Sequence, residues 1–225
     1  MLVRLPASVD SSSGGQCWSH AEKWGPLSGT VIHTSYSRCA AFYCFIQDIK
    51  PYPNGFAVRF PFDLDSGAMR PRLHPIDNQI YITCHKGWDT TAPLDGVIYR
   101  FRHAEDKMVG ICDAAVTASG IRLTFASDLD PRSVKPGAFE AYREDDAKNI
   151  LKPAEYKLGE VRLIDFRTIE INIPSIGKEA LANRTDEKGN IQVKPPISLS
   201  YKLKSKSGKV FEQKIYATIN SLPKK

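Results

Sequence analysis

Arg70, Arg72 and His74 lie two residues apart in the segment MRPRLHP, residues 69–75. Residues with this spacing project from one face of a β-strand. Two guanidinium groups on one face could hold a carboxylate or a polar sugar, because each presents a planar fork of N–H donors. The same spacing also describes a solvated face that is paired with nearby carboxylates. The nearby carboxylates are those of Asp63, Asp65 and Asp77.

A second candidate for ligand binding is the polar segment SSSGGQ, residues 11–16, which ends in Gln16. Its serines and glycines predict a short flexible loop whose backbone could closely approach a ligand or a neighbouring sheet. A phosphate cradle would also need a following helix, and Pro26 and a strand-like run follow instead. Trp88, after Gly87, offers a flat ring on which a sugar could stack.

The dipeptide Cys84–His85 is how a c-type haem attachment site ends. Such a site needs a second thiol three residues before the cysteine, and Tyr81 occupies that position. Alternation gives a different interpretation, because Ile80, Ile82 and Cys84 fall on one side of a strand. The sequence therefore predicts a core strand here and no haem.

The remaining chemistry-bearing residues fit no known site. The segment DLDSG, residues 63–67, begins like a calcium loop but has no bidentate glutamate downstream. The histidines are scattered, and no GxSxG, HExxH or glycine-rich nucleotide loop occurs. The cysteines form no CxxC pair and lie in strand-like contexts, which indicates buried thiols and no metal site. They are Cys17, Cys39, Cys44, Cys84 and Cys112.

The composition is that of a globular domain, with 225 residues, 42% hydrophobic and 25% charged. No apolar run approaches the roughly 20 residues of a membrane span, and the N-terminus lacks the features of a signal peptide. The formal charge is +6, with the excess in the C-terminal half, where lysines alternate with inward aromatic and aliphatic residues. This pattern is typical of the wet face of a hairpin, and it argues against a nucleic-acid groove.

Short β-like runs, separated by Gly, Pro, Asn and Asp, account for most of the chain. The first hundred residues predict an antiparallel meander, and about seven further strands follow residue 109. We expect helical turns only at DPRSV and SIGKEALANRT. The expected strands include GTVIHTSY, AAFYCFIQDI, GFAVRFPF, QIYITCHK, GVIYRFRH, IRLTFAS, AFEAYRE, EVRLIDF, RTIEINIP, ISLSYKLK and KVFEQKIYATI.

Five segments together resemble one family. They are SVDSSSGGQCW, KWGPLSGTVIHTSYS, DSGAMRPRLHPIDNQIYITCHKGWDT, DGVIYRFRH and SGIRLTFASDLDP. In this order they resemble the end of the β-propeller and the following β-sandwich of large secreted bacterial proteins similar to glucose/sorbosone dehydrogenases. The resemblance covers roughly residues 1–135, and its most specific parts are Ser13–Gln16, Met69–Pro75 with Asp77, and Gly87–Trp88.

The resemblance implies an all-β chain: one or two terminal propeller blades over residues 1–108, then an immunoglobulin-like antiparallel sandwich over 109–225. A complete propeller needs more blades than fit here. The chain is therefore expected to be a C-terminal, non-catalytic portion of a periplasmic or extracellular protein. Its partners would be the remaining blades or a cytochrome domain. The family uses a quinone and haem c, but its catalytic positions match nothing here, so no cofactor is assigned to this chain.

Two other functions stay open. The first is a stand-alone extracellular carbohydrate-binding module, with a saccharide site formed by the Trp88 region and the face of Arg70 and Arg72. His74 and Gln16 are the other ligand-binding candidates. The second is a protein-interaction domain whose exposed sheet edge pairs with a strand of a partner. In the family, aromatic residues near turns, such as Trp88, are also expected to act as wedges between blades.

Overall fold

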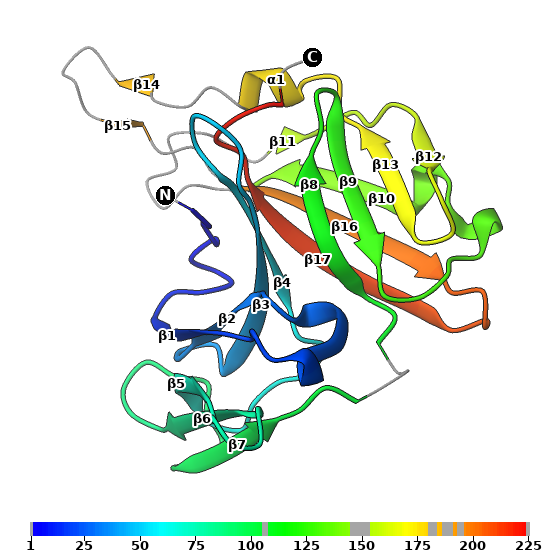
Figure 1. The fold of residues 1–225 in the computed structure, drawn as a ribbon. Helices are drawn as coiled ribbons and strands as arrows, with labels where there is room; N and C mark the ends of the chain where they lie inside the picture. Colours follow the sequence, from blue (N-terminus) through cyan, green and yellow to red (C-terminus); the bar gives the residue numbers. More distant parts are fainter. Residues whose placement is uncertain are drawn as a thin grey trace. The chain divides into compact units, whose positions relative to one another are not determined.

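A computed structural model describes residues 2–104, 108–144, 154–179, 184–185, 191–192 and 196–223. Antiparallel sheets account for most elements, and the helices are few and short (Figure 1). This confirms the all-β class that the alternating apolar runs predict. No helix in the described ranges is long and apolar enough to span a lipid bilayer.

The chain forms two compact units. The N-terminal unit consists of Leu5–Phe45 and Ala57–Met108, and the C-terminal unit consists of Met1–Arg4, Ile46–Phe56 and Val109–Lys225. The predicted domain boundary at residue 108 would place the short segments 1–4 and 46–56 in the N-terminal domain, whereas in the structure they belong to the C-terminal unit. The segment 46–56 is the tip of a hairpin whose strands run through both units.

The N-terminal unit contains a meander in which each strand pairs with the next along the chain, and a separate three-stranded sheet ordered β5-β6-β7. A 3-10 helix, η1 (Glu22–Leu27), lies between the first two strands of the meander. The meander strands are β1 (Ser13–Trp18), β2 (Val31–Ser35), β3 (Ala40–Gln47) and β4 (Asn54–Arg59). The other sheet consists of β5 (Gly67–Leu73), β6 (Ile80–His85) and β7 (Val97–Phe101).

Strand β1 corrects the prediction of a flexible loop at SSSGGQ. Residues Ser13–Trp18 pair with β2, with Gln16 opposite His33 and Trp18 opposite Val31. The glycines are needed for packing and not for flexibility, because a Cβ on Gly14 would lie 2.3 Å from the carbonyl oxygen of Ala68. Local composition thus gave the wrong result, since the contacts that make this segment a strand come from distant parts of the sequence.

Strand β6 follows the predicted alternation. Ile80 and Ile82 are fully buried and Cys84 is nearly so, whereas Thr83 and His85 are exposed. The core-strand interpretation of Cys84–His85 is therefore confirmed. All five cysteines are free thiols, and burial raises the pKa of Cys84 to about 11.

The C-terminal unit contains a four-stranded antiparallel sheet ordered β12-β13-β9-β8. It also contains the strands β17-β16-β10-β11, which continue from β4 in one eight-stranded sheet ordered β1-β2-β3-β4-β17-β16-β10-β11. Strands β14 (Arg184–Thr185) and β15 (Ile191–Gln192) pair with each other as a two-stranded antiparallel ribbon. The first sheet comprises β8 (Ile111–Val116), β9 (Gly120–Phe125), β12 (Val161–Leu163) and β13 (Thr168–Asn172). The strands of the eight-stranded sheet in this unit are β10 (Phe139–Arg143), β11 (Ala154–Glu155), β16 (Ile197–Lys204) and β17 (Val210–Thr218).

An aromatic cluster connects these two sheets. The ring of Phe125 on β9 lies 5.4 Å from Tyr201 on β16 and 5.9 Å from Phe211 on β17, both edge-on. The alternation predicted for β9 and β16 is confirmed, because Leu123 is fully buried and Lys202 is exposed. Short helical elements occur at both expected places, as η2 (Pro131–Ser133) and α1 (Ile176–Glu179). A further 3-10 turn, η3, spans Pro136–Ala138.

Asn54, at the start of β4, forms hydrogen bonds with the C-terminal segment of the chain within this unit. Its side chain is fully buried. Its amide donates to Gln47 Oε1 and to the Ser221 carbonyl, each at 2.9 Å. Its Oδ1 accepts from the backbone N–H groups of Asn220 at 2.8 Å and Ser221 at 2.9 Å. All the hydrogen-bonding capacity of this amide is therefore used inside the fold.

Candidate functional site

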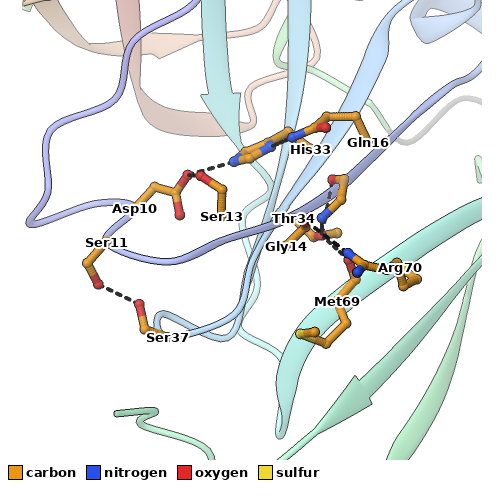
Figure 2. Close-up of polar contacts among 11 residues, drawn as sticks. Asp10, Ser11, Ser13, Gly14, Gln16, His33, Thr34, Ser37, Met69 and Arg70 are labelled. Carbon is orange, nitrogen blue, oxygen red and sulfur yellow. Dashed lines mark hydrogen bonds and ion pairs between the residues drawn. The ribbon is translucent and has the colours of Figure 1, made fainter. Parts of the chain in front are cut away.

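Gln16 takes part in a polar chain with His33 and Asp10 (Figure 2). Gln16 Nε2 lies 2.9 Å from His33 Nδ1, and His33 Nε2 lies 2.7 Å from Asp10 Oδ2. An amide nitrogen only donates, so Nδ1 is the acceptor and the ring proton sits on Nε2, directed at the carboxylate. Both imidazole nitrogens are thus occupied, and neither is available as a general base.

The Asp10 carboxylate is held in its ionised form. Its side chain is 5% exposed and also accepts from Ser13 Oγ at 2.8 Å. Burial alone would raise the pKa of Asp10, but the hydrogen bonds from His33 and Ser13 hold it below the ordinary value of 3.8. Because this pKa is low and both nitrogens of His33 are hydrogen-bonded, we assign the chain Asp10–His33–Gln16 a structural role in which it ties the segment before β1 to β2.

The backbone of β1 lies directly against β5. Thr34 Oγ1 accepts from the Gly15 N–H at 2.9 Å and donates to the Met69 carbonyl at 3.3 Å, so one hydroxyl bridges the two strands (Figure 2). Only glycine at residue 14 permits this separation, as the 2.3 Å clash of an added Cβ indicates. Strand β5, and with it Arg70 and Arg72, is therefore placed by β1 and β2.

Arg70 and Arg72 share the exposed face of β5, as their spacing predicts, while Ala68 and Pro71 are buried. The register extends this face across the sheet: Arg72 is opposite Tyr81, which is opposite Arg100. In the adjacent row Arg70 is opposite Thr83, which is opposite Ile98. We call this surface the arginine face; it consists of Arg70, Arg72, Tyr81, Thr83, Ile98 and Arg100.

The positive charge of the arginine face is not neutralised by the described part of the chain. No described carboxylate lies within ion-pair distance of any of the three guanidinium groups, whereas Arg59, Arg122 and Arg167 each have such a partner. Arg70 reaches the Gly14 carbonyl at 3.4 Å, and Arg72 reaches the carbonyl of Pro71 at 2.7 Å. These carbonyls occupy single donors of forks that have five, so most donors face solvent.

His74 lies just beyond the end of β5, at the border of the arginine face. Its ring packs edge-on against Tyr81 at 5.6 Å, and its Nδ1 lies 3.1 Å from Asp77 Oδ1. The Tyr81 hydroxyl donates to Asp77 Oδ2 at 2.8 Å. Hydrogen bonds from the Gln79 backbone and from Tyr81 lower the pKa of Asp77. The predicted pairing with Asp77 therefore applies to His74 and not to the arginines.

Trp88 lies beyond the opposite end of β6 from His74, so the structure does not bring all five predicted site residues together. Trp88 is 82% exposed, and its ring lies 6.4 Å from that of Tyr36, which in turn is tilted against the ring of His85 at 5.6 Å. The Gln16 side chain bonds His33, whereas Arg70 reaches β1 at the Gly14 carbonyl. Arg72 is paired opposite Tyr81, against which His74 packs. Trp88 belongs to a separate aromatic group.

Tyr81 and Arg100 belong to the site but were missed as site residues in the sequence. Each follows the period-two alternation of its own strand, so their exposure was predictable. Their position beside Arg72 depends on the register of β5, β6 and β7, which local patterns do not fix when the strands are joined by loops of several residues.

Metal chemistry finds no support in the described residues, where no group of three or more His, Cys, Asp or Glu side chains is placed to hold an ion. Comparisons with known proteins add no assignment. No family model matches the chain, and neither a curated protein nor a solved structure matches it.

Proposed function

We propose that this chain is a non-catalytic binding module whose arginine face binds an acidic saccharide. The observation that carries the proposal is the set of three arginines with no carboxylate partner on one exposed sheet face, around the ring of Tyr81. Unpaired guanidinium groups on a protein surface are well suited to carboxylate or sulfate groups, which they bind with two parallel hydrogen bonds.

The layout of the arginine face favours a ligand with several acidic groups over a single small anion. Arg72 and Arg100 stand on strands separated by β6, so their backbones lie about 10 Å apart. Arg70 is two residues along β5 from Arg72, a further separation of about 7 Å. Thr83 and Tyr81 between them supply a hydroxyl and an apolar ring surface, which suit the mixed polar and apolar faces of a sugar.

The family resemblance remains a proposal about the parent protein. Strands β1 to β4 pair in chain order, as the strands of a propeller blade do, and this supports assigning them to a terminal blade; unlike a separate blade, their sheet continues from β4 into β17. The contact through the Phe125 cluster between the four-stranded sheet and strands β16 and β17 of the eight-stranded sheet supports an immunoglobulin-like sandwich in the C-terminal unit. In that setting the arginine face would be a binding surface of a periplasmic or extracellular protein that is linked to a cytochrome.

Binding is tested by calorimetry with an oligogalacturonate and with a neutral oligosaccharide of the same length. We expect the oligogalacturonate alone to bind, with affinity that falls as salt rises. Arg72→Gln and Arg100→Gln should each weaken binding by about fivefold to twentyfold. Arg162→Gln, which removes an equally exposed arginine from the C-terminal unit, is the matched control and should change nothing. Equal binding of the neutral sugar, or an equal loss in Arg162→Gln, would refute the proposal.

The non-catalytic part of the proposal has its own test. The purified chain is incubated with glucose or sorbosone and an artificial electron acceptor, and dye reduction is followed. We expect no turnover, because the catalytic positions of the family that the chain resembles match nothing in this sequence, and His33 has both nitrogens hydrogen-bonded. Turnover above the rate of a heat-denatured sample would mean that the chain is an enzyme.

A further inference from the structure

A groove with a volume of about 310 Å³ lies along β7 in the N-terminal unit. Four consecutive residues, 99–102, contribute to its lining. Successive side chains of a strand point to opposite faces of a sheet. Tyr99, Arg100 and Phe101 belong to β7, and Arg102 follows it. Because side chains of both faces line the groove, it lies at the edge of the sheet that β7 forms.

Strand β7 is the last strand of its sheet, since β6 is its only partner among the described strands. Every second residue of such a strand directs its N–H and C=O away from the sheet. These groups are available to another extended chain. The groove therefore combines a row of backbone hydrogen-bonding groups with a side-chain pocket.

The apolar wall of the groove is a cluster of three phenylalanines. Phe101 lies edge-on to Phe60 at 5.6 Å and to Phe62 at 5.3 Å. Phe62 remains 44% exposed although it belongs to this cluster. Asp65 accepts from the Tyr99 hydroxyl at 2.7 Å, and this bond holds the segment after β4 against β7. The pocket is thus formed in advance and leaves one ring face open.

The rim of the groove is positively charged. Arg100 and Arg102 are exposed, and no described carboxylate pairs with either. Asp63 also lines the groove, but it forms an ion pair with Arg59. A guest with negative charge is therefore complementary to this edge.

We infer that the β7 edge binds an extended acidic peptide, which adds to the sheet as a further strand with one large apolar side chain in the phenylalanine pocket. Residues directly opposite each other on paired strands share a face. The guest residues opposite Arg100, Phe101 and Arg102 would therefore be acidic, apolar and acidic in turn. This inference does not depend on the saccharide proposal, because it is argued from the edge of β7 and the phenylalanine pocket; the two surfaces share only Arg100.

The test begins with a displayed library of random decapeptides selected on the wild-type chain and counter-selected on Phe62→Ala. We expect enrichment of peptides with an aromatic or large aliphatic residue flanked on both sides by Asp or Glu. Phe62→Ala should weaken an enriched peptide by about tenfold in fluorescence polarisation. Phe166→Ala, which removes another exposed phenylalanine in the C-terminal unit, should leave its affinity unchanged. Enrichment without the acidic–apolar–acidic pattern, or equal binding to Phe62→Ala, would overturn the inference.

Two further measurements separate strand addition from other binding. Methylating the backbone nitrogens of alternate guest residues should weaken binding by roughly threefold to tenfold per lost bond in one alternate set and hardly at all in the other. Arg102→Glu, a surface change that spares the core, should turn the selection toward basic–apolar–basic peptides. Equal effects of both methylated sets, or an unchanged preference in Arg102→Glu, would contradict strand addition. Self-association of the wild type that disappears in Phe62→Ala would assign the edge to a second copy instead.

Discussion

Replacing Asp10 by alanine tests whether the Asp10–His33–Gln16 chain stabilises the N-terminal unit. The change removes a carboxylate whose side chain is 5% exposed, and leaves the Nε2–H of His33, itself 11% exposed, without its acceptor. A hydrogen bond to a charged group contributes about 1.5–3 kcal/mol, and an unpartnered buried donor costs about 1–3 kcal/mol more. We therefore expect the free energy of unfolding to fall by about 3 kcal/mol at pH 7.

Urea unfolding followed by tryptophan fluorescence measures this loss in the correct part of the molecule. Trp18, Trp24 and Trp88 are all the tryptophans of the chain, and all three lie in the N-terminal unit. Asp48→Ala is the matched control, because the Asp48 side chain is 81% exposed and lies 3.9 Å from its lysine partner. Its effect should stay within about 0.5 kcal/mol.

The pH dependence of the difference gives an independent check. The folded pKa of Asp10 lies below its ordinary value of 3.8, so the unfolded state takes up a proton at higher pH than the folded state. The stabilisation by the ionised carboxylate is complete above the unfolded pKa and is lost as the pH falls through the folded one. The gap between wild type and Asp10→Ala should be constant from about pH 7 to 5 and narrow below about pH 4. A gap under about 0.5 kcal/mol at pH 7, or one that is unchanged in acid, would show the reasoning to be wrong.

Three other predictions concern packing and thiol chemistry. Gly14→Ala should lower the free energy of unfolding by about 2–4 kcal/mol, because its Cβ meets backbone oxygens of β5. Gly137→Ala is the control and should leave the free energy of unfolding unchanged, because its Cβ meets nothing within 4 Å. The same fluorescence assay and calorimetry measure the stability of both variants. Asn54→Ala should destabilise the C-terminal unit by about 3 kcal/mol in calorimetry, since four hydrogen bonds of a fully buried amide are lost; a loss below about 1 kcal/mol would contradict this. Burial raises the pKa of Cys44 to about 12, so a disulfide reagent at pH 8 should modify this residue only after unfolding. Peptide mapping separates it from the less buried Cys17 and Cys112, and rapid labelling of Cys44 itself in the native chain would disprove the packing.

The sequence predicted two kinds of strand: apolar runs that are buried along most of their length, as in β3 and β4, and strands whose burial follows a local alternation. In β6, β9 and β16 the apolar residues fall on every second position, and each strand has one buried and one wet face. A period of two is a property of the strand itself, so a window of six residues is enough to detect it.

Strand β1 could not be predicted in this way. Its sequence SGGQCW has the serine and glycine content of a loop, and a strand of this composition is stable only when neighbours supply its hydrogen bonds. Those neighbours are β2 and β5, whose residues, such as Thr34 and Met69, lie about twenty to fifty-five positions away along the chain. The same glycines that weaken the local signal permit the close packing.

The candidate site divides between local and non-local information. The shared face of Arg70 and Arg72 follows from their spacing alone, and the structure confirms that both are exposed. Arg100 lies on the same face as these two arginines because of the strand register across β6. Trp88 does not, because it follows the C-terminal end of β6, whereas the loop from β5 enters at the N-terminal end. Both depend on pairings between strands, which a single sequence constrains only weakly.

Arg100 connects the two binding surfaces proposed for the β5-β6-β7 sheet. Its backbone belongs to the edge of β7, and its side chain belongs both to the arginine face and to the rim of the groove. One guanidinium group cannot form full ion pairs with two acidic ligands at once. A ligand on either surface therefore weakens the electrostatic attraction of Arg100 for a ligand on the other. Because coupling between two binding equilibria is reciprocal, an acidic saccharide on the face and an acidic peptide at the edge should each weaken the other to the same extent.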